Sequence, residues 1–147
     1  MWLYNGKEFT SEMIEENVWF VYEVYDTQTK MYYIGKKKFW SKLTRPPLKG
    51  QKRKRRSLKE SDWKTYYGSS EKVKELIENT GEWRFERRIL KLCKTPGEMS
   101  YYETKEQIDR EVLFKPDEYY NAFIGCKIHR SHVFKGNWKI SKSTVYK

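Results

Sequence analysis

A short stretch of this chain concentrates side chains that can bind phosphate. Between Lys36 and Lys59 there are twelve lysines and arginines and no acidic residue, whereas the whole chain has 31 basic and 20 acidic side chains and a net charge of +11. The stretch therefore holds the entire charge excess, which is typical of a surface that binds a polyanion. The phosphate contacts are expected from Lys37, Lys38, Lys42, Lys52, Arg53, Lys54, Arg55 and Arg56.

A β-hairpin is predicted immediately before the basic stretch. Residues 17–25 and 31–35 are rich in β-branched and aromatic residues, and the polar residues 26–30 between them are typical of a turn. Tyr22 and Tyr33 then lie on adjacent strands, where side chains can contact one another across the pair.

The elements predicted downstream are two helices and a third strand. Ser69 and Ser70 can cap a helix over 71–79, and Gly81 can end it. Thr95 followed by proline is the pattern of a second helix start, with that helix running to about Leu113. The other segments are an irregular lead or small helix within 1–17, an insert over 36–62 that Pro46 and Pro47 keep from forming one helix, a strand over 83–93 and a basic tail over 125–147. This order predicts an α+β fold in a single domain spanning 1–147: a small three-stranded antiparallel sheet with flanking helices and a basic insert after the hairpin.

The composition favours a soluble protein of a reducing compartment. Cys93 and Cys126 are too few for a disulfide framework, and the longest apolar runs are far too short to span a membrane. His129 and His132 follow Cys126 at a spacing tighter than that of zinc-finger ligands, so we expect them to contact phosphate or solvent. No signal peptide is visible. We expect a cytoplasmic protein without a membrane partner.

An ordered set of short motifs resembles the GIY-YIG nuclease superfamily. Phe-Val-Tyr ending at Tyr22, and Tyr-Ile-Gly beginning at Tyr33, resemble the paired motif that names the superfamily. A strand with Arg-Ile-Leu from Arg88, a helix opening in Tyr-Tyr-Glu at Glu103 and a closing Tyr-Asn at Asn121 follow at compatible spacings. The resemblance spans about 18–124 and is closest to SegE-like free-standing endonucleases of tailed phages, in which a basic insert follows the second motif.

The resemblance implies metal-assisted hydrolysis of phosphodiester bonds in DNA. Tyr22 and Tyr33 match the tyrosines that hold or deprotonate the attacking water, and the pattern leaves open which of them is the base. Nearby cations would help by lowering a phenol pKa from about 10. Glu103 matches the carboxylate that holds Mg²⁺ or Mn²⁺, with Glu106 one turn later as the alternative. One carboxylate is sufficient for Mg²⁺, which keeps waters as its other ligands.

The resemblance also implies roles in contacting phosphate and orienting the site. Lys36 matches a lysine that contacts the scissile phosphate in part of the family, and Asn121 matches the closing asparagine that orients other groups. The family's arginine has no clear counterpart, because Leu43 stands at the usual distance, and we favour Arg45 for its role. Phe20 replaces the first glycine of the name motif. Other candidates are Arg53, Arg55 and Arg56 for the arginine, and Tyr66 or Tyr67 for a family position that is often His or Tyr.

A second interpretation involves no catalysis. The basic stretch by itself would suit a DNA- or RNA-binding protein whose binding is sensitive to salt and indifferent to Glu103. Under either interpretation no obligate protein partner is evident, and both a monomer and a homodimer are compatible with the sequence. If the chain is phage-encoded, its compartment is the cytoplasm of the bacterial host.

Overall fold

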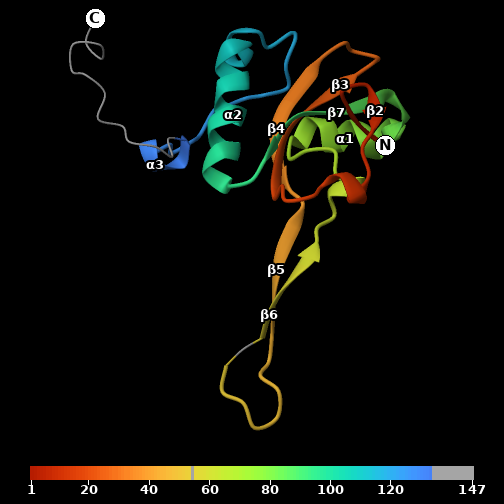
Figure 1. Ribbon diagram of the computed structural model, residues 1–147. Coiled ribbons are helices and arrows are strands. Elements are labelled where there is room, and N and C mark those ends of the chain that lie inside the picture. The colour runs from red at the N-terminus through yellow and green to blue at the C-terminus, as the bar shows by residue number, and fades with distance from the viewer. Residues whose placement is uncertain (54, 134–147) are drawn as a thin grey trace, which may run out of the picture.

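The centre of the fold is a mixed five-stranded sheet with the strand order β2-β1-β7-β3-β4 (Figure 1). The computed structural model describes residues 1–53 and 55–133. β3 pairs antiparallel with both β4 and β7, while β1 runs parallel to β7 and antiparallel to β2. The strands are β1 (Trp2–Tyr4), β2 (Lys7–Glu8), β3 (Trp19–Asp26), β4 (Tyr32–Lys38) and β7 (Phe85–Cys93).

The three predicted antiparallel strands are confirmed, but the sheet is larger than predicted, and the added strand β1 runs parallel to β7. The predicted strands correspond to β3, β4 and β7, but residues 1–17, expected to be irregular or helical, add the hairpin β1–β2. Asn5 and Gly6 form its turn at positive φ, 51° and 78°. Asn-Gly between short strands is a strong hairpin signal. The small helix expected near Ser11 is a single 3₁₀ turn over Ser11–Met13.

The two main helices begin where their capping residues predict. The hydroxyl of Ser70 accepts a hydrogen bond from the amide of Val73, and Gly81 follows the helix at φ 96°. Thr95 caps the second helix in the same way. That helix ends at Asp109, short of the predicted end at Leu113. The helices are α1 (Glu71–Thr80), α2 (Pro96–Asp109) and α3 (Arg130–Val133), with 3₁₀ turns at Trp63–Thr65, Glu82–Arg84 and Val112–Phe114.

The sheet separates two clusters of buried side chains. On one face, Phe20 and Tyr22 pack with Trp2, Phe39 and other aromatic residues and with Val73 of α1. On the opposite face, Val21 and Ile34 pack with Cys93, with Met99 of α2 and with Val112. Alternation along β3 and β4 produces this division, because successive side chains point to opposite faces. Aromatic rings supply most of the first cluster, in which the Phe20 and Phe39 ring centroids are 4.5 Å apart.

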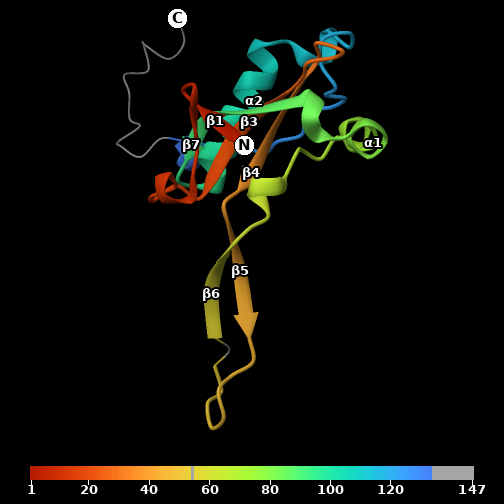
Figure 2. The ribbon, with the colours of Figure 1, turned by 90° about the vertical axis from the view of Figure 1, so that its right-hand side faces the viewer.

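The basic insert forms a separate two-stranded antiparallel ribbon. It consists of β5 (Trp40–Arg45) and β6 (Arg55–Glu60), and it projects away from the sheet and the helices (Figures 1 and 2). Its base is fixed to the body, because the backbone amide of Ser61 donates to the carbonyl oxygen of Phe39 at 2.7 Å, and Phe39 itself is fully buried. We call the segment 40–60 the ribbon.

Part of the predicted basic surface is not described by the structure. Lys54 and residues 134–147 of the predicted basic tail lie outside the described residues. Within residues 1–53 and 55–133, no helix has the length and apolar character needed to cross a bilayer.

Candidate active site

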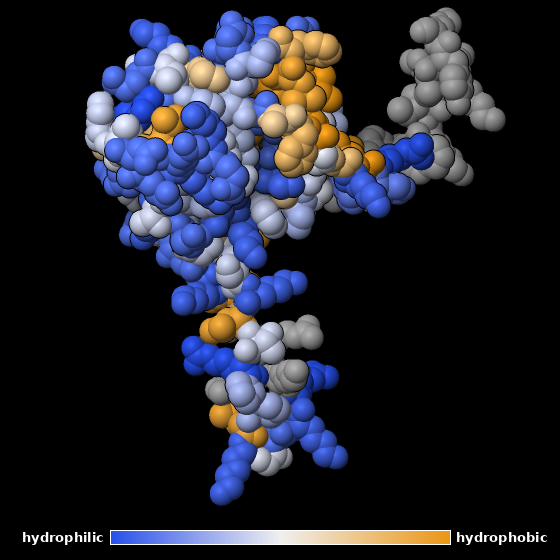
Figure 3. Space-filling view, turned by 180° about the vertical axis from the view of Figure 1, so that it is seen from behind, coloured by the Kyte–Doolittle hydropathy of each residue, from blue (hydrophilic) through white to orange (hydrophobic). Residues whose placement is uncertain are grey.

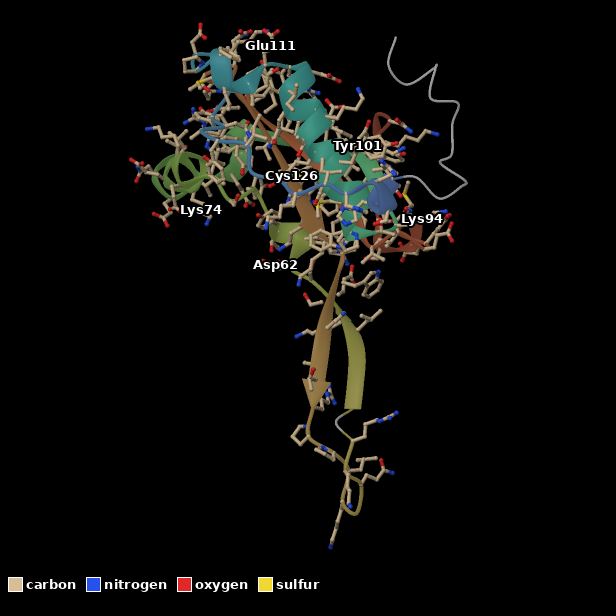
Figure 4. All side chains as sticks on the ribbon, turned by 90° about the vertical axis from the view of Figure 1, so that its left-hand side faces the viewer. Asp62, Lys74, Lys94, Tyr101, Glu111 and Cys126 are labelled. Atoms are coloured by element: carbon tan, nitrogen blue, oxygen red, sulfur yellow. The ribbon has the colours of Figure 1, made fainter. Side chains whose placement is uncertain are left out.

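A cavity of about 650 Å³ opens beside β4. Tyr33 and Lys36 line it from β4, Glu103 and Gln107 from α2, and Asn121 from the segment that follows the last 3₁₀ turn. The N-terminus of α1 closes the remaining side. Figure 4 views this side: the chain carrying Cys126 crosses between α1, marked by Lys74, and α2, marked by Tyr101 (Figure 4). Four predicted site residues, Tyr33, Lys36, Glu103 and Asn121, are therefore gathered around one hollow.

Gly35 leaves the space in which the two tyrosine rings of the hairpin lie close together. Tyr22 is paired with Gly35 across β3 and β4, and its ring lies over the glycine. A Cβ at position 35 would lie 2.6 Å from the Tyr22 Cζ atom and 3.0 Å from a Tyr33 ring carbon. Any larger residue at 35 would displace these rings. The Tyr22 and Tyr33 ring centroids are 6.3 Å apart.

Tyr22 is completely buried behind the cavity. The register of β3 against β7 shifts between Val21 and Tyr22, a bulge of the kind that re-aims side chains near functional sites. Among the described residues its hydroxyl has no hydrogen-bond partner within bonding geometry. Burial, reinforced by the neighbouring phenols of Tyr66 and Tyr33, raises the pKa of Tyr22 well above its usual value.

Tyr33 is the phenol that reaches the cavity. Its hydroxyl lies 2.8 Å from the hydroxyl of Ser69, at the start of α1. Burial raises the pKa of Tyr33, although the hydrogen bond with Ser69 works in the opposite direction. We expected the basic stretch to lower the tyrosine pKa values, and that expectation was wrong for both residues. Loss of solvent is the dominant influence on the two phenols.

Glu103 is the buried carboxylate of the site. It is 8% exposed, and its Oε1 lies 3.7 Å from the Nζ of Lys36. Burial raises the pKa of Glu103, and Lys36 acts against that rise. Glu106, the alternative, forms an ion pair with Arg110 at 3.0 Å on another side of α2. The geometry thus favours Glu103 over Glu106.

Asn121 fastens the strand that carries Tyr33 and Lys36. Its side-chain oxygen accepts from the amide of Ile34 at 3.0 Å, and its side-chain nitrogen donates to the carbonyl of Ile34 at 2.8 Å. Gln107 donates to the same carbonyl at 3.2 Å. These backbone groups belong to the outer edge of β4, which also forms a short parallel bridge between Tyr32 and Tyr119. Both ends of the Asn121 amide are therefore engaged by the backbone of β4.

The profile of one nuclease family matches almost the whole described chain. Residues 2–124 match the family described as "Putative endonuclease segE, GIY-YIG domain". The chain belongs to this SegE-type GIY-YIG family. The resemblance stated from the motifs is thereby confirmed, and the match begins ahead of residue 18 because it includes β1 and β2. Comparison with curated proteins and with solved structures gives no match.

The predicted phosphate-contacting residues of this SegE-type chain lie apart from the cavity. Arg45 is exposed at the outer end of β5, where it is paired in register with Arg55, so the structure does not bring it to Glu103. Lys37 lies at the base of the ribbon, 2.6 Å from Asp62 and over the ring of Tyr66. Exposed side chains along the ribbon are Lys42, Lys52 and Arg53, whereas Lys38 is half-buried and Arg55 and Arg56 are described only as backbone.

Three further residues contribute to the GIY-YIG site and were not predicted as site residues from the sequence. Gln107 is one helical turn beyond Glu103 on the same face, a spacing that could have identified it. Ser69 was expected only as helix-cap material. Gly68, at φ 109°, lets the chain pass close to both tyrosines, since a Cβ there would lie 3.2 Å from Tyr33 and 3.3 Å from the Tyr22 hydroxyl. Of the two candidates for the His/Tyr position, Tyr66 packs edge-on against Tyr22 and Tyr67 against Phe85.

The donor set of the cavity fits a hard divalent cation. No group of three or more His, Cys, Asp or Glu residues gathers within 1–53 and 55–133, so the described part of the chain offers no closed zinc-type cage. Glu103 presents one carboxylate to a water-accessible hollow, with the amide of Gln107 beside it. Mg²⁺ and Mn²⁺ accept such sites, because water and substrate oxygens supply their other ligands.

Proposed function

We propose that this chain is a metal-dependent DNA endonuclease that hydrolyses phosphodiester bonds in the cavity beside β4. The observation that supports this most directly is the convergence of Tyr33, Lys36 and Glu103 on one cavity in a chain of a GIY-YIG nuclease family. A phenol, a cation and a carboxylate are the groups that such a hydrolysis requires at the scissile phosphate.

In this proposal Tyr33 binds and deprotonates the attacking water, and Tyr22 positions Tyr33. Tyr33 lines the cavity, whereas Tyr22 is fully buried and reaches the site only through its contacts with Tyr33 and Gly35. Because its pKa is raised, Tyr33 is a neutral phenol near pH 7. The neutral phenol holds the water by a hydrogen bond, and the small fraction of Tyr33 present as phenolate takes the proton of the attacking water.

In this proposal Glu103 binds the metal ion, and Lys36 contacts the phosphate. A Mg²⁺ or Mn²⁺ ion bound by Glu103 would polarise the phosphate and stabilise the leaving oxygen. Lys36 is 41% exposed at the cavity and can turn from Glu103 towards a phosphate oxygen, where its charge offsets the charge that develops there. Asn121 and Gln107 hold β4 in place, so that Tyr33 and Lys36 keep their positions.

A non-catalytic nucleic-acid-binding protein is the second candidate. Two observations favour it: none of the described residues that line the cavity is an arginine, and both tyrosine pKa values are raised. This candidate uses the basic ribbon alone and gives Glu103 no role in the action on DNA.

Plasmid nicking separates the two candidates. Purified protein is incubated with supercoiled plasmid and Mg²⁺ or Mn²⁺, beside Glu103→Gln and the matched control Glu106→Gln. We expect Glu103→Gln to lose about 10³-fold or more in cleavage rate, as removal of a metal ligand or an electrostatic catalytic group typically does, and to keep its DNA affinity. Glu106→Gln should remain within about threefold of the parent, because it changes only an exposed helix ion pair.

Two results would contradict the proposed nuclease activity. One is the absence of cleavage by the parent protein with either ion on plasmid and on linear duplexes. The other is equal cleavage by Glu103→Gln and the parent. A selective loss in Glu106→Gln would move the metal to that residue and overturn the assignment of Glu103.

A further inference from the structure

The ribbon has no core of its own to explain its stability. Within residues 1–53 and 55–133 its two strands pair only with each other, and two of its leucines are exposed, Leu58 at 66% and Leu48 at 49%. Figure 3 shows a mostly hydrophilic surface along its length (Figure 3). An isolated two-stranded ribbon is marginally stable in water.

The register of the ribbon adds repulsion between its strands. Arg45 lies directly opposite Arg55, and Thr44 lies opposite Arg56. Like charges opposite one another destabilise a strand pair. Such an arrangement becomes favourable when a polyanion lies against the ribbon and neutralises both charges.

The ribbon is joined firmly to the strand that carries the site. β4 leads through the buried Phe39 into β5, and Trp63 is buried just after β6. Lys37 pairs with Asp62 at this junction, which Figure 4 marks by Asp62 (Figure 4). The hydroxyl of Ser61 donates to the carbonyl of Lys38 at 2.6 Å. The base of the ribbon is thus tied to the body by buried rings and by bonds on both strands.

The length and width of the ribbon select a particular surface of DNA. Arg45 is nine residues beyond Lys36, which is at most about 30 Å of extended chain and close to one turn of B-form DNA, about 34 Å. Two strands about 4.8 Å apart with their side chains fit the major groove, which is about 12 Å wide, and exceed the minor groove, about 6 Å wide. Lysine and arginine hydrogen-bond to guanine edges in the major groove, and exposed leucines can contact thymine methyl groups there.

We propose that the ribbon inserts into the major groove of duplex DNA up to one helical turn from the bond that is cut, and so provides recognition for the cavity beside β4. This proposal rests on the proposed endonuclease function for the position of the cut, but the binding of the ribbon can be tested without cleavage. Lys42 and Arg45 carry the phosphate and base contacts of β5.

The first test measures binding in the Glu103→Gln background, which prevents cleavage. A duplex of about 20 base pairs is titrated over a range of salt concentrations with the Lys42→Gln/Arg45→Gln variant and with a matched control, Lys7→Gln/Lys30→Gln. The control removes the same charge from exposed lysines on β2 and at the β3–β4 turn, the end of the hairpin away from the ribbon. We expect the ribbon variant to lower the salt slope by about 2 and to weaken binding by roughly 10- to 60-fold near 0.1 M salt. The control should change the slope by less than about 0.5. Equal effects of the two variants, or none from the ribbon variant, would overturn the proposal.

The second test identifies the groove. The duplex is treated with dimethyl sulfate, which methylates N7 of guanine in the major groove and N3 of adenine in the minor groove, and bound and free DNA are then compared. Bound DNA should be depleted of methylated guanine, and this depletion should disappear in the ribbon variant. Depletion of methylated adenine alone would contradict the major-groove assignment. So would equally tight, ribbon-dependent binding of duplex RNA, whose major groove is too deep and narrow for side chains to read.

The results distinguish this proposal from the proposed function. If the parent does not cut DNA but the Glu103→Gln protein binds it through Lys42 and Arg45, the endonuclease fails and the ribbon assignment holds. If the parent cuts DNA and the ribbon variant binds like the control, the ribbon assignment fails and the endonuclease holds. If both hold, sequenced cleavage products should show base preferences at most about one helical turn from the cut, and these preferences should be lost in the ribbon variant.

Discussion

The cavity beside β4 and the ribbon are built on opposite principles, although β4 leads directly into β5. Around the cavity, key polar groups are held by partners: the Asn121 amide bonds to the backbone of Ile34 through both its oxygen and its nitrogen, and Tyr33 bonds with Ser69. On the ribbon, the side chains of Lys42 and Arg45 are exposed, and Arg45 is paired in register with Arg55. The first region is pre-organised and tolerates little change, while the second gains its favourable interactions from a ligand. The difference teaches that positioning for chemistry and affinity for DNA reside in separable parts of this chain.

Breaking the buried ion pair beneath the site should have the largest effect on stability. Arg84 contacts Asp26 through two hydrogen bonds of 2.8 Å, and Tyr120, next to Asn121, donates to the same carboxylate at 2.7 Å. Asp26→Asn should lower the free energy of unfolding by about 3–5 kcal/mol, because it leaves a buried arginine without its charge partner. Urea denaturation measures this. A loss under about 1 kcal/mol would show that the pair is not essential to the body.

The same carboxylate makes the body sensitive to acid. Burial would raise the pKa of Asp26, but hydrogen bonds from Arg84, Tyr120 and the Gln28 amide together hold it at about 2. The folded pKa is below the unfolded value of about 3.9. The stabilisation is therefore complete above about pH 5 and is lost as the pH falls towards about 2. In Asp26→Asn, the slope of stability against pH in this window should be reduced.

Filling the space over Gly35 is the next most severe change. In Gly35→Ala the new methyl group would overlap the buried Tyr22 ring, so we expect a loss of about 3 kcal/mol in stability and loss of cleavage. Gly50→Ala in the ribbon loop is the counterpart: nothing lies within 4 Å of its Cβ position, although φ is +85°. Its strain of about 1–2 kcal/mol should remain local to the loop. Similar global destabilisation by both variants would contradict the separation of the two regions.

The pH dependence of cleavage tests the role of Tyr33. Because its pKa is raised above the usual value near 10, the phenol is protonated throughout pH 6–9. If it accepts the proton of the attacking water, the cleavage rate should rise about tenfold per pH unit over this range without a plateau. Tyr33→Phe should lower the rate and flatten the slope. A plateau near neutrality in the parent, or an unchanged slope in Tyr33→Phe, would exclude Tyr33 as the base.

The smallest effect is expected from the stability of the ribbon itself. Arg45→Thr removes the repulsion with Arg55 and should raise the stability of the free ribbon by about 0.2–1 kcal/mol while weakening DNA binding. Amide hydrogen exchange at Lys42–Arg45 measures this local stability. A decrease in protection would mean that Arg45 stabilises the ribbon instead of opposing its pairing.

Local sequence signals predicted the central strands and the helix starts better than the N-terminal hairpin and the ribbon. The hairpin β3–β4, the strand β7 and both helix starts were predictable because strand composition and capping residues act over a few residues. The N-terminal hairpin was missed despite Asn5-Gly6, whose turn signal was available in the sequence. The ribbon was expected only as a basic insert, because Pro46 and Pro47 excluded a helix without indicating paired strands.

The site depended more strongly on contacts distant in sequence. Tyr33, Lys36, Glu103 and Asn121 were identified from motif order and are brought to one cavity. The bonds of Asn121 to Ile34 join residues 87 positions apart, so no local pattern could have shown that it clamps β4. The raised tyrosine pKa values were also beyond the sequence, because they follow from burial, not from the nearby basic residues. Arg45 was favoured for the family's arginine because it stands near Leu43, which occupies the usual position, but the ribbon carries it away from the cavity.

The proposed hydrolysis requires a divalent cation bound by Glu103 in the cavity that Tyr33 and Lys36 line. Crystals soaked with Mn²⁺ and measured at its absorption edge would test this directly. We predict an anomalous peak about 2.0–2.3 Å from the Glu103 carboxylate, a typical distance for hard cations and oxygen ligands, on the cavity side that faces Tyr33. A peak at Glu106, or Mn²⁺ bound elsewhere with none at Glu103, would contradict the account.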